Sequence, residues 1–379
     1  MWKRRVAAAL AIAVLLVAVD LGLGQVGKAF VPDWEVRAHK LKFRTEDPVF
    51  HHGFAPLVSQ YDRWGAEKYP LFTNSLGLRD ASPRQLELKG TGKRIALIGD
   101  SFTEGVGYPW EQTFAGILSK SLATEGTEVL NLGVSSYSPL LYFKKVEHLV
   151  ETRGLRIDEL IVFIDVGDVY NEAAWYSLNS AGQIISNLTG GINIAERHGR
   201  LGDWLAVNSM TGKLVYTMAD LWKFQRGKKQ AERESQSVDA GVWSDFGAII
   251  NARDSRWTWD KDAWGEWGEK GVANSLEHMD MLLAVTRRNN IHLTVAVYPW
   301  PAQIWHHVGG NPPTTRIFGQ WSRDRGVDFL DLNPLFFKQD RESTLRDFYI
   351  PNDVHWNSRG HALVAEAVQG WYRQRQPGR

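Results

Sequence analysis

The sequence predicts an α/β fold in which a mostly parallel sheet is covered by helices on both faces. From residue 93 onward, short apolar segments that suit strands alternate with segments of helical periodicity. The strand segments are rich in β-branched residues and apolar on both sides, which is typical of strands buried between two helical layers. We expect five strands, at residues 94–98, 128–132, 160–164, 291–297 and 327–331.

Helices are expected between these strands and at the end of the chain. Apolar residues recur at helical spacing in the intervening segments, and Ser358 is a suitable cap for the last helix. In a parallel sheet, functional groups gather at the carboxyl ends of the strands. The expected helices are residues 111–123, 140–153, 264–288 and 359–373.

The composition excludes several classes of protein. Among 379 residues, 44 Lys and Arg nearly balance 43 Asp and Glu, which leaves no basic stripe for nucleic acid. The absence of cysteine excludes disulfides, thiolate metal sites and a cysteine nucleophile. The neighbouring residues His51 and His52 lack a third ligand nearby in the sequence, so we expect no metal and no cofactor.

The amino terminus has the pattern of a membrane anchor. Three basic residues, Lys3, Arg4 and Arg5, precede an apolar stretch at residues 6–24 that is long enough to cross a bilayer as a helix. Basic residues before the span predict that the amino end stays in the cytoplasm and that the rest is exported. A cleaved signal peptide is the alternative, because Asp20 interrupts the apolar run; the poor match to a cleavage site favours an anchor at residues 1–24.

The exported part is expected to have two regions. Residues 25–90 contain several prolines and few periodicities, and we interpret them as an irregular lead-in. Residues 91–379 are expected to form the α/β domain, with an insertion at about 173–263 between its third and fourth strands. Because long loops in compact domains are usually functional, the insertion is interpreted as a lid or substrate-binding elaboration; a decorative surface insertion is the alternative.

Two distant segments carry residues suited to nucleophilic catalysis. Gly99-Asp100-Ser101 follows the first strand of the domain, so Ser101 should lie at the carboxyl edge of the sheet. A serine hydroxyl needs a base to take its proton. His355 precedes the last helix, and Asp353 is placed to hold its imidazole in the correct tautomer.

These segments resemble the first and last blocks of the SGNH/GDSL hydrolase superfamily. Asn131-Leu132-Gly133 is similar to the second block, and the match covers about residues 93–373. The resemblance implies a three-layer α/β/α flavodoxin-like domain, a Ser101, His355 and Asp353 triad, and an oxyanion held by backbone N–H groups of Ser101 and Gly133. The final block and the amino-terminal anchor are closest to membrane-tethered bacterial members, some of which, including alginate acetyltransferases, acylate exported polysaccharides. It therefore implies a single-pass protein of the bacterial inner membrane with a periplasmic domain.

The third block departs from the family pattern. If Asp168 is the family aspartate, Gly167 stands where an asparagine side chain normally completes the oxyanion hole. Loss of such a donor costs about 2.7–4 kcal/mol of transition-state stabilisation. Three alternatives remain: Asn171 substitutes, backbone N–H groups including that of Gly167 suffice, or activity is weak.

The sequence thus predicts serine-dependent ester hydrolysis, or acyl (acetyl) transfer, on a cell-envelope or exported glycan through a Ser101 acyl-enzyme. A catalytically silent glycan-binding or assembly protein with the same fold is the alternative. Expected partners are a carbohydrate or acylated glycan, the inner membrane and polysaccharide-assembly proteins. The residues expected to contact substrate are Asp100, Asp168, Trp300 and Trp356.

Overall fold

The structure is a computed structural model, which describes residues 2–30, 43–64, 67–186, 199–215, 218, 243–306 and 311–375. The chain divides into two compact units. The large unit comprises residues 43–193 and 238–379, and the small unit comprises residues 1–42 and 194–237. Each unit is described separately.

The large unit is built on an eight-stranded sheet with the order β12-β11-β8-β6-β7-β5-β4-β3. The first five strands in that order are parallel, and β5, β4 and β3 continue the sheet in antiparallel fashion. The parallel strands taken in chain order give the arrangement 2-1-3-4-5, which is the flavodoxin-like order. This confirms the predicted fold class. The strands are β3 (Ser59–Trp64), β4 (Glu67–Thr73), β5 (Arg79–Asp80), β6 (Lys93–Ile98), β7 (Thr127–Asn131), β8 (Glu159–Ile164), β11 (His292–Val297) and β12 (Asp328–Asp331).

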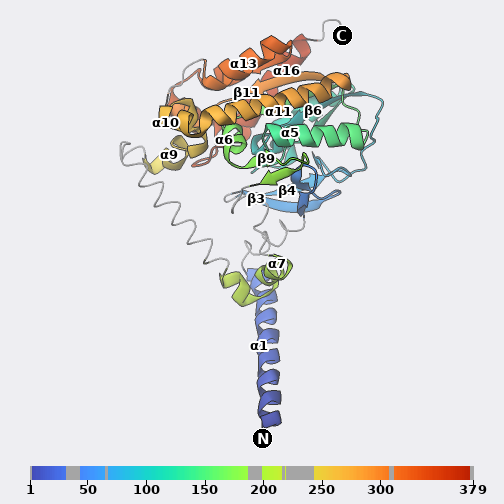
Figure 1. The fold of residues 1–379 in the computed structure, drawn as a ribbon, viewed down its shortest axis with the longest axis vertical. Coiled ribbons are helices and arrows are strands. Elements are labelled where there is room, and N and C mark those ends of the chain that lie inside the picture. The colour runs from blue at the N-terminus through green and yellow to red at the C-terminus, as the bar shows by residue number, and fades with distance from the viewer. Residues whose placement is uncertain are drawn as a thin grey trace. The chain divides into compact units, whose positions relative to one another are not determined.

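Helices form a layer on each face of this sheet. The connections from β6 to β7 and from β7 to β8 run in opposite directions, so right-handed crossovers place their helices on opposite faces. Figure 1 shows α5 and α11 side by side across one face. On the other face α4 packs against α16. The helices of the two layers are α4 (Phe114–Ala123), α5 (Pro139–Glu147), α11 (Glu269–Arg288), α13 (Pro313–Arg325) and α16 (Ser358–Gln374).

Shorter elements complete the large unit. Two antiparallel hairpins, β1 with β2 and β9 with β10, lie outside the main sheet. The expected helices at 140–153 and 264–288 each include a π-helical turn, η2 and η4. These elements are β1 (Arg44–Asp47), β2 (His51–Phe54), α3 (Ser101–Glu104), η1 (Trp110–Gln112), η2 (His148–Thr152), α6 (Val166–Ala174), β9 (Tyr176–Leu178), β10 (Ile184–Ser186), α9 (Trp243–Ile250), η3 (Arg253–Thr258), α10 (Lys261–Ala263), η4 (Trp264–Gly268), α12 (Pro301–Trp305), α14 (Asn333–Phe336) and α15 (Arg341–Phe348).

The prediction of an irregular lead-in at residues 25–90 is wrong for its second half. Strands β3, β4 and β5 belong to the main sheet, and Arg79 of β5 pairs with Asn131 of β7. Pro70 lies inside β4, where the sequence suggested a break. Since β5 reaches only Phe72 and Thr73, β4 has an open edge beside Pro70, and proline is tolerated at such an edge.

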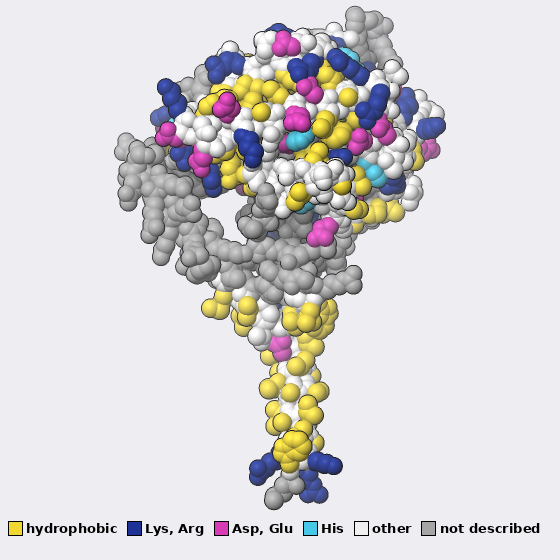
Figure 2. Space-filling view, in the orientation of Figure 1, with side chains coloured by type: hydrophobic (Ala, Val, Ile, Leu, Met, Phe, Trp, Pro, Cys, Tyr) yellow, Lys and Arg dark blue, Asp and Glu magenta, His cyan; other side chains and the backbone are white. Residues whose placement is uncertain are grey.

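The small unit contains α1 (Trp2–Phe30) and α7 (Gly199–Asn208), followed by helical residues 210–215. Figure 2 shows hydrophobic side chains along α1 and a cluster of Lys and Arg side chains at its first turns. Residues 2–27 are long and apolar enough to cross a membrane. A signal sequence meets the same criteria of length and composition, so they do not distinguish it from a membrane anchor.

The predicted insertion at 173–263 is divided between the two units. Its described first part, with β9 and β10, and its last part, with α9, η3 and α10, belong to the large unit. Residues 199–215 belong to the small unit. Apart from residue 218, the rest of the insertion lies outside the described residues.

The buried β4 makes the lead-in essential to the stability of the large unit. The Leu71 side chain is fully buried, and Leu71→Ala should lower the free energy of unfolding by about 2–5 kcal/mol, because the cavity adds to the lost burial. Leu88→Ala, at a position that is 36% exposed, is the matched control and should change it by less than about 0.5 kcal/mol. Denaturant unfolding of both variants measures this. Equal effects would contradict the integration of the lead-in.

Candidate active site

Ser101 lies at the carboxyl end of β6, beside the point where the strand order reverses between β6 and β8. Asp100 caps the short helix α3, and its Oδ1 accepts the backbone N–H of Phe102 at 2.9 Å. Gly99 is required by close packing, because a Cβ there would lie 2.1 Å from Thr103 Oγ1. The strand end, the cap and this contact together fix Ser101 as the first residue of α3.

The structure brings Ser101, His355 and Asp353 together. Ser101 Oγ lies 2.6 Å from His355 Nε2, and His355 Nδ1 lies 2.5 Å from Asp353 Oδ1. The same carboxylate oxygen accepts the backbone N–H of His355 at 2.9 Å. With Nδ1–H donating to Asp353, Nε2 is left as an acceptor for the serine hydroxyl. Ser101 and His355 are 8% and 7% exposed, so each keeps a small accessible surface.

Asp353 is held as a carboxylate. Burial by itself raises the pKa of Asp353, but the interaction with His355 and the hydrogen bonds from His355 and Trp64 outweigh burial and lower the pKa to about 2. An ionised carboxylate orients the imidazole and stabilises the imidazolium that forms when the serine gives up its proton.

Trp64 is a contact of this group that the sequence analysis missed. Its indole N–H donates to Asp353 Oδ2 at 2.7 Å, and its ring meets the His355 ring edge-on at 4.8 Å between centroids. Trp64 ends β3, almost 290 residues before Asp353 in the chain. No local motif marks it, because its position depends on the antiparallel strands that the sequence did not reveal.

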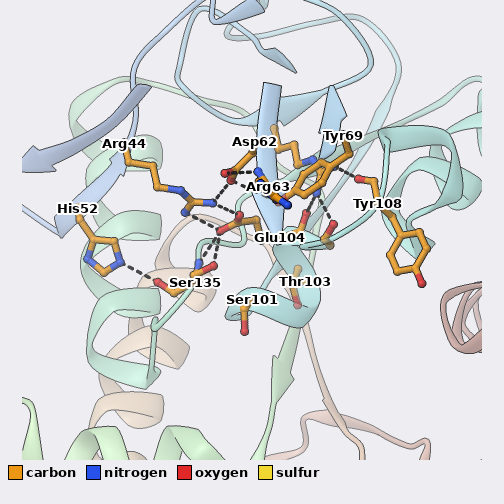
Figure 3. Close-up of polar contacts among 12 residues, drawn as sticks. Arg44, His52, Asp62, Arg63, Tyr69, Ser101, Thr103, Glu104, Tyr108 and Ser135 are labelled. Carbon is orange, nitrogen blue, oxygen red and sulfur yellow. Dashed lines mark hydrogen bonds and ion pairs between the residues drawn. The ribbon is translucent and has the colours of Figure 1, made fainter. Parts of the chain in front are cut away.

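A buried ion network holds the helix that begins at Ser101 (Figure 3). Glu104, the last residue of α3, is fully buried and accepts from Arg44 at 2.5 Å and from the backbone N–H of Ser135 at 2.7 Å. Arg44 also binds Asp62 at 2.7 Å. Burial alone would raise the pKa of Glu104, but the Arg44 guanidinium outweighs it and holds the pKa below its ordinary value. Arg79 donates to the backbone carbonyls that follow, of Glu104, Gly105 and Tyr108.

The expected oxyanion donors differ in their availability. The Gly133 N–H already donates to Asn131 Oδ1 at 2.9 Å, which removes it as a free donor. Within the described parts of the chain, no group accepts from the backbone N–H of Ser101 or Gly167. Asn171 is buried in α6 with its Oδ1 unpartnered, and no described contact joins it to Ser101 or His355.

Gly167 has no room for a side chain. A Cβ there would lie 2.9 Å from the Cζ2 atom of Trp300, and the Trp300 indole N–H donates to Asp165 Oδ2 at 2.8 Å. The Trp300 ring therefore packs where a side chain of residue 167 would begin.

Three buried aspartates surround the base of the site. Carboxylate oxygens of Asp100, Asp165 and Asp168 lie within 4.8 Å of one another, close enough to share a cation. Burial and then the neighbouring charge of Asp100 raise the pKa of Asp165 well above its ordinary value, and burial followed by the Asp165 charge does the same for Asp168. A raised pKa favours the neutral form of such an acid, which can donate a hydrogen bond to a neighbouring carboxylate.

Two of the predicted substrate contacts are wrong. Trp356 is fully buried and Asp168 is 1% exposed, so neither presents a surface to a ligand. Trp356 packs against Phe102 and Tyr298, and Asp168 accepts from Tyr142 Oη at 2.8 Å. Asp100 and Trp300 are 7% and 8% exposed, and their contact with substrate stays a prediction.

A cavity of about 360 Å³ lies beside the loop that carries Asp353 and His355. It is lined by apolar and aromatic side chains and by Arg346. The preceding residues of the loop form one wall, and α9 of the insertion and α15 contribute the rest. The lining includes Phe246, Ile249, Leu345, Tyr349, Ile350 and Asn352.

Comparisons with known proteins found structural similarity only. No protein-family model and no curated protein matches the chain. The fold is similar to that of a two-domain esterase active on acetylated mannans, with 11% identity, a TM-score of 0.36 and coverage of 74% of this chain and 49% of that one. The chain thus spans about half the length of that esterase.

Two further solved structures are similar over most of their length. One is a catalytic mutant of an acetylxylan esterase from Geobacillus stearothermophilus, at 12% identity and a TM-score of 0.39, covering 75% of this chain and 95% of that one. The other is a GDSL-like lipase from Bacteroides thetaiotaomicron, at 10% identity and a TM-score of 0.36, covering 75% and 89%. Similarity at this level carries no argument about activity.

Trp64→Phe should change the electrostatics of the site while keeping an aromatic ring beside His355. Loss of the indole hydrogen bond should raise the pKa of Asp353 from about 2 toward its usual 3.8. It should also lower kcat/KM for a soluble ester by about tenfold, the effect expected of one hydrogen bond to a charged group. Carboxyl NMR titration and ester kinetics measure the two effects. Tyr61→Phe, an exposed ring on the same strand, is the control, and an unchanged Asp353 pKa in Trp64→Phe would contradict the assignment.

The lowered pKa of Asp353 also predicts a pH window for stability. Because its folded pKa lies below the ordinary value, Asp353 contributes stability that is complete above pH 3.8 and is lost as the pH falls toward about 2. The difference in unfolding free energy between the natural chain and Asp353→Asn should therefore shrink across that interval. Chemical denaturation at several pH values tests this, and a difference that stays constant would be inconsistent with an ionised Asp353.

Proposed function

We propose that this protein is a serine-dependent esterase or acyltransferase that works through an acyl-enzyme on Ser101. The observation that carries the proposal is the 2.6 Å contact between Ser101 Oγ and His355 Nε2, in a chain where Asp353 fixes the opposite ring nitrogen. A nucleophile, a base and an orienting carboxylate in this sequence of contacts are the groups that acyl transfer requires.

In the first step His355 Nε2 takes the hydroxyl proton as Ser101 Oγ bonds to the ester carbonyl carbon. His355 then gives that proton to the departing alcohol oxygen as its bond to the carbonyl carbon breaks, which leaves an acyl-serine. In the second step His355 takes a proton from water or from a sugar hydroxyl, and that oxygen attacks the acyl carbon. Serine leaves and recovers the proton. Asp353 remains ionised throughout.

Backbone donors are proposed to stabilise the oxyanion. The N–H groups of Ser101 and Gly167 are candidates because no described group occupies them.

The proposed substrate is an acylated glycan outside the cytoplasm. Support comes from α1, whose first turn is basic and whose following residues are apolar, which suits an inner-membrane anchor with an exported large unit. The cavity beside the Asp353 loop is a candidate subsite, because aromatic walls suit sugar rings and Arg346 can meet their polar groups. Polysaccharide-assembly proteins are the proposed partners.

A catalytically silent glycan-binding protein is the second candidate. Gly167, the occupied N–H of Gly133 and the ring of Trp300 favour it, because they remove side-chain and backbone donors that an oxyanion would need.

Ser101→Ala separates the two candidates. For the enzyme, hydrolysis of p-nitrophenyl acetate by the full chain in detergent should fall by more than about 10³-fold, because the attacking hydroxyl is gone. Ser82→Ala, at an exposed serine, should leave the rate unchanged. Equal rates in the natural chain and Ser101→Ala would support the silent protein.

The acyl acceptor can be identified in the same preparation. Mass spectrometry of the natural chain should show one acetyl group on Ser101 early in the reaction. If the chain is a transferase, adding an oligosaccharide should speed loss of that acetyl group and produce an acetylated sugar. Release of acetate alone would identify an esterase.

A further inference from the structure

Residues 199–215 pack against the last turns of α1 within the small unit. The backbone N–H and the Oγ1 of Thr211 both donate to Asp20 Oδ1 at 2.8 Å. Gln25 donates to Asn208 Oδ1 at 3.2 Å, and Lys213 Nζ donates to the carbonyl of Gly24. These contacts join the insertion to the apolar helix, far away in the sequence.

Gly24 makes this close approach possible. A Cβ on Gly24 would lie 2.0 Å from the carbonyl oxygen of Asn208, whereas a Cβ on Gly22 would meet nothing within 4 Å. Asp20 and Gly24 are four residues apart and therefore lie on the same face of the helix. Asp20 and Gly24 thus both belong to the face of α1 that packs against residues 199–215, which explains why neither position carries an apolar side chain.

The 199–215 segment also presents apolar side chains that nothing described covers. Leu201, Trp204, Leu214 and Val215 are 70%, 48%, 51% and 58% exposed. The side chains of α1 itself are exposed along its candidate membrane span. Large apolar surfaces of this kind mark contact with a partner or a membrane.

The position of the segment along α1 matches a bilayer surface. Residues 6–24 rise about 1.5 Å each, so the apolar stretch is close to the roughly 30 Å thickness of a hydrocarbon core. Asp20 and Gly24 then fall near its outer boundary. Tryptophan is favoured at that depth, and a carboxylate there requires hydrogen-bond partners, which Thr211 supplies.

We propose that the 199–215 segment lies on the bilayer that α1 spans, with Leu201, Trp204, Leu214 and Val215 in the lipid interface, and that α1 is retained as its docking partner. The occupant of the apolar surface is lipid, because that surface is continuous with a helix that requires lipid. Removal of α1 by signal cleavage would leave Ser209 and Lys213, which are 3% and 2% exposed, without the helix that covers them. This part of the insertion is then an anchoring element rather than a lid.

The docked face can be tested by cross-linking, since the chain contains no cysteine. In full-length protein in membranes, Asp20→Cys combined with Thr211→Cys should form an intrachain disulfide on mild oxidation. The control pair is Val19→Cys with Thr211→Cys. Residue 19 projects from a different side of α1 than residue 20, so this pair should form no disulfide. Intact mass of the membrane-bound protein should include the residues of α1. Absence of the specific disulfide, or a mass beginning after residue 24, would overturn the proposal.

The lipid contact can be tested with an environment-sensitive dye on Leu214→Cys in phosphatidylcholine and phosphatidylglycerol vesicles. Lipids that carry a quencher near the headgroup should quench this dye, with a blue shift of its emission. Adding Gly24→Leu should abolish the quenching at position 214, and Gly22→Leu, where the extra side chain has room, should not.

Absence of quenching at position 214, or equal effects of Gly24→Leu and Gly22→Leu, would contradict the interface assignment. Hydrolysis of p-nitrophenyl acetate by the same variants keeps this inference separate from the proposed function. The rate should stay unchanged, because none of these residues belongs to the site around Ser101.

Discussion

The candidate site depends on a buried ion pair between Glu104 and Arg44. Glu104 is fully buried in the four-residue helix that begins with Ser101, and its partner Arg44 comes from the lead-in. A helix of one turn has little stability of its own. Removing one partner of a buried ion pair lowers the free energy of unfolding by about 3–5 kcal/mol, because it leaves the other charge buried and unpaired. The turn that carries Ser101 is therefore stable only when the lead-in is folded against it.

This constraint explains why residues 43–80 form part of the large unit. Arg44 neutralises Glu104, and Arg79 binds the carbonyls at the end of the same turn. Strand β3, which lies between these two arginines in the sequence, places Trp64 against Asp353. One region thus supports both the nucleophile and the carboxylate that orients its base, although it contributes none of the three reacting side chains.

The elements that local sequence patterns identify were predicted correctly. The strands that depend on pairing between distant segments were not predicted. Short apolar segments identified the parallel strands, and their common carboxyl edge implied that Ser101 and His355 could meet. No local pattern identifies β5, which has only two residues and pairs with β7 through Arg79 and Asn131, far apart in the sequence. The burial of Trp356 was missed for a related reason. A polar motif suggests a surface, whereas this ring fills the space between Phe102 and Tyr298.

The glycine at 167 is part of a rearranged wall rather than an isolated loss. Its absent side chain leaves space for the Trp300 ring, and the indole N–H satisfies Asp165, which caps α6. Trp257, from the described end of the insertion, donates to the carbonyl of Val166 at 2.9 Å. Two tryptophans thus bind the two residues that precede Gly167, Trp300 through the Asp165 side chain and Trp257 through the Val166 carbonyl. If an oxyanion is stabilised here, its donor is a rigid backbone N–H, and rigidity is what a fixed dipole needs to stabilise a charge as it develops.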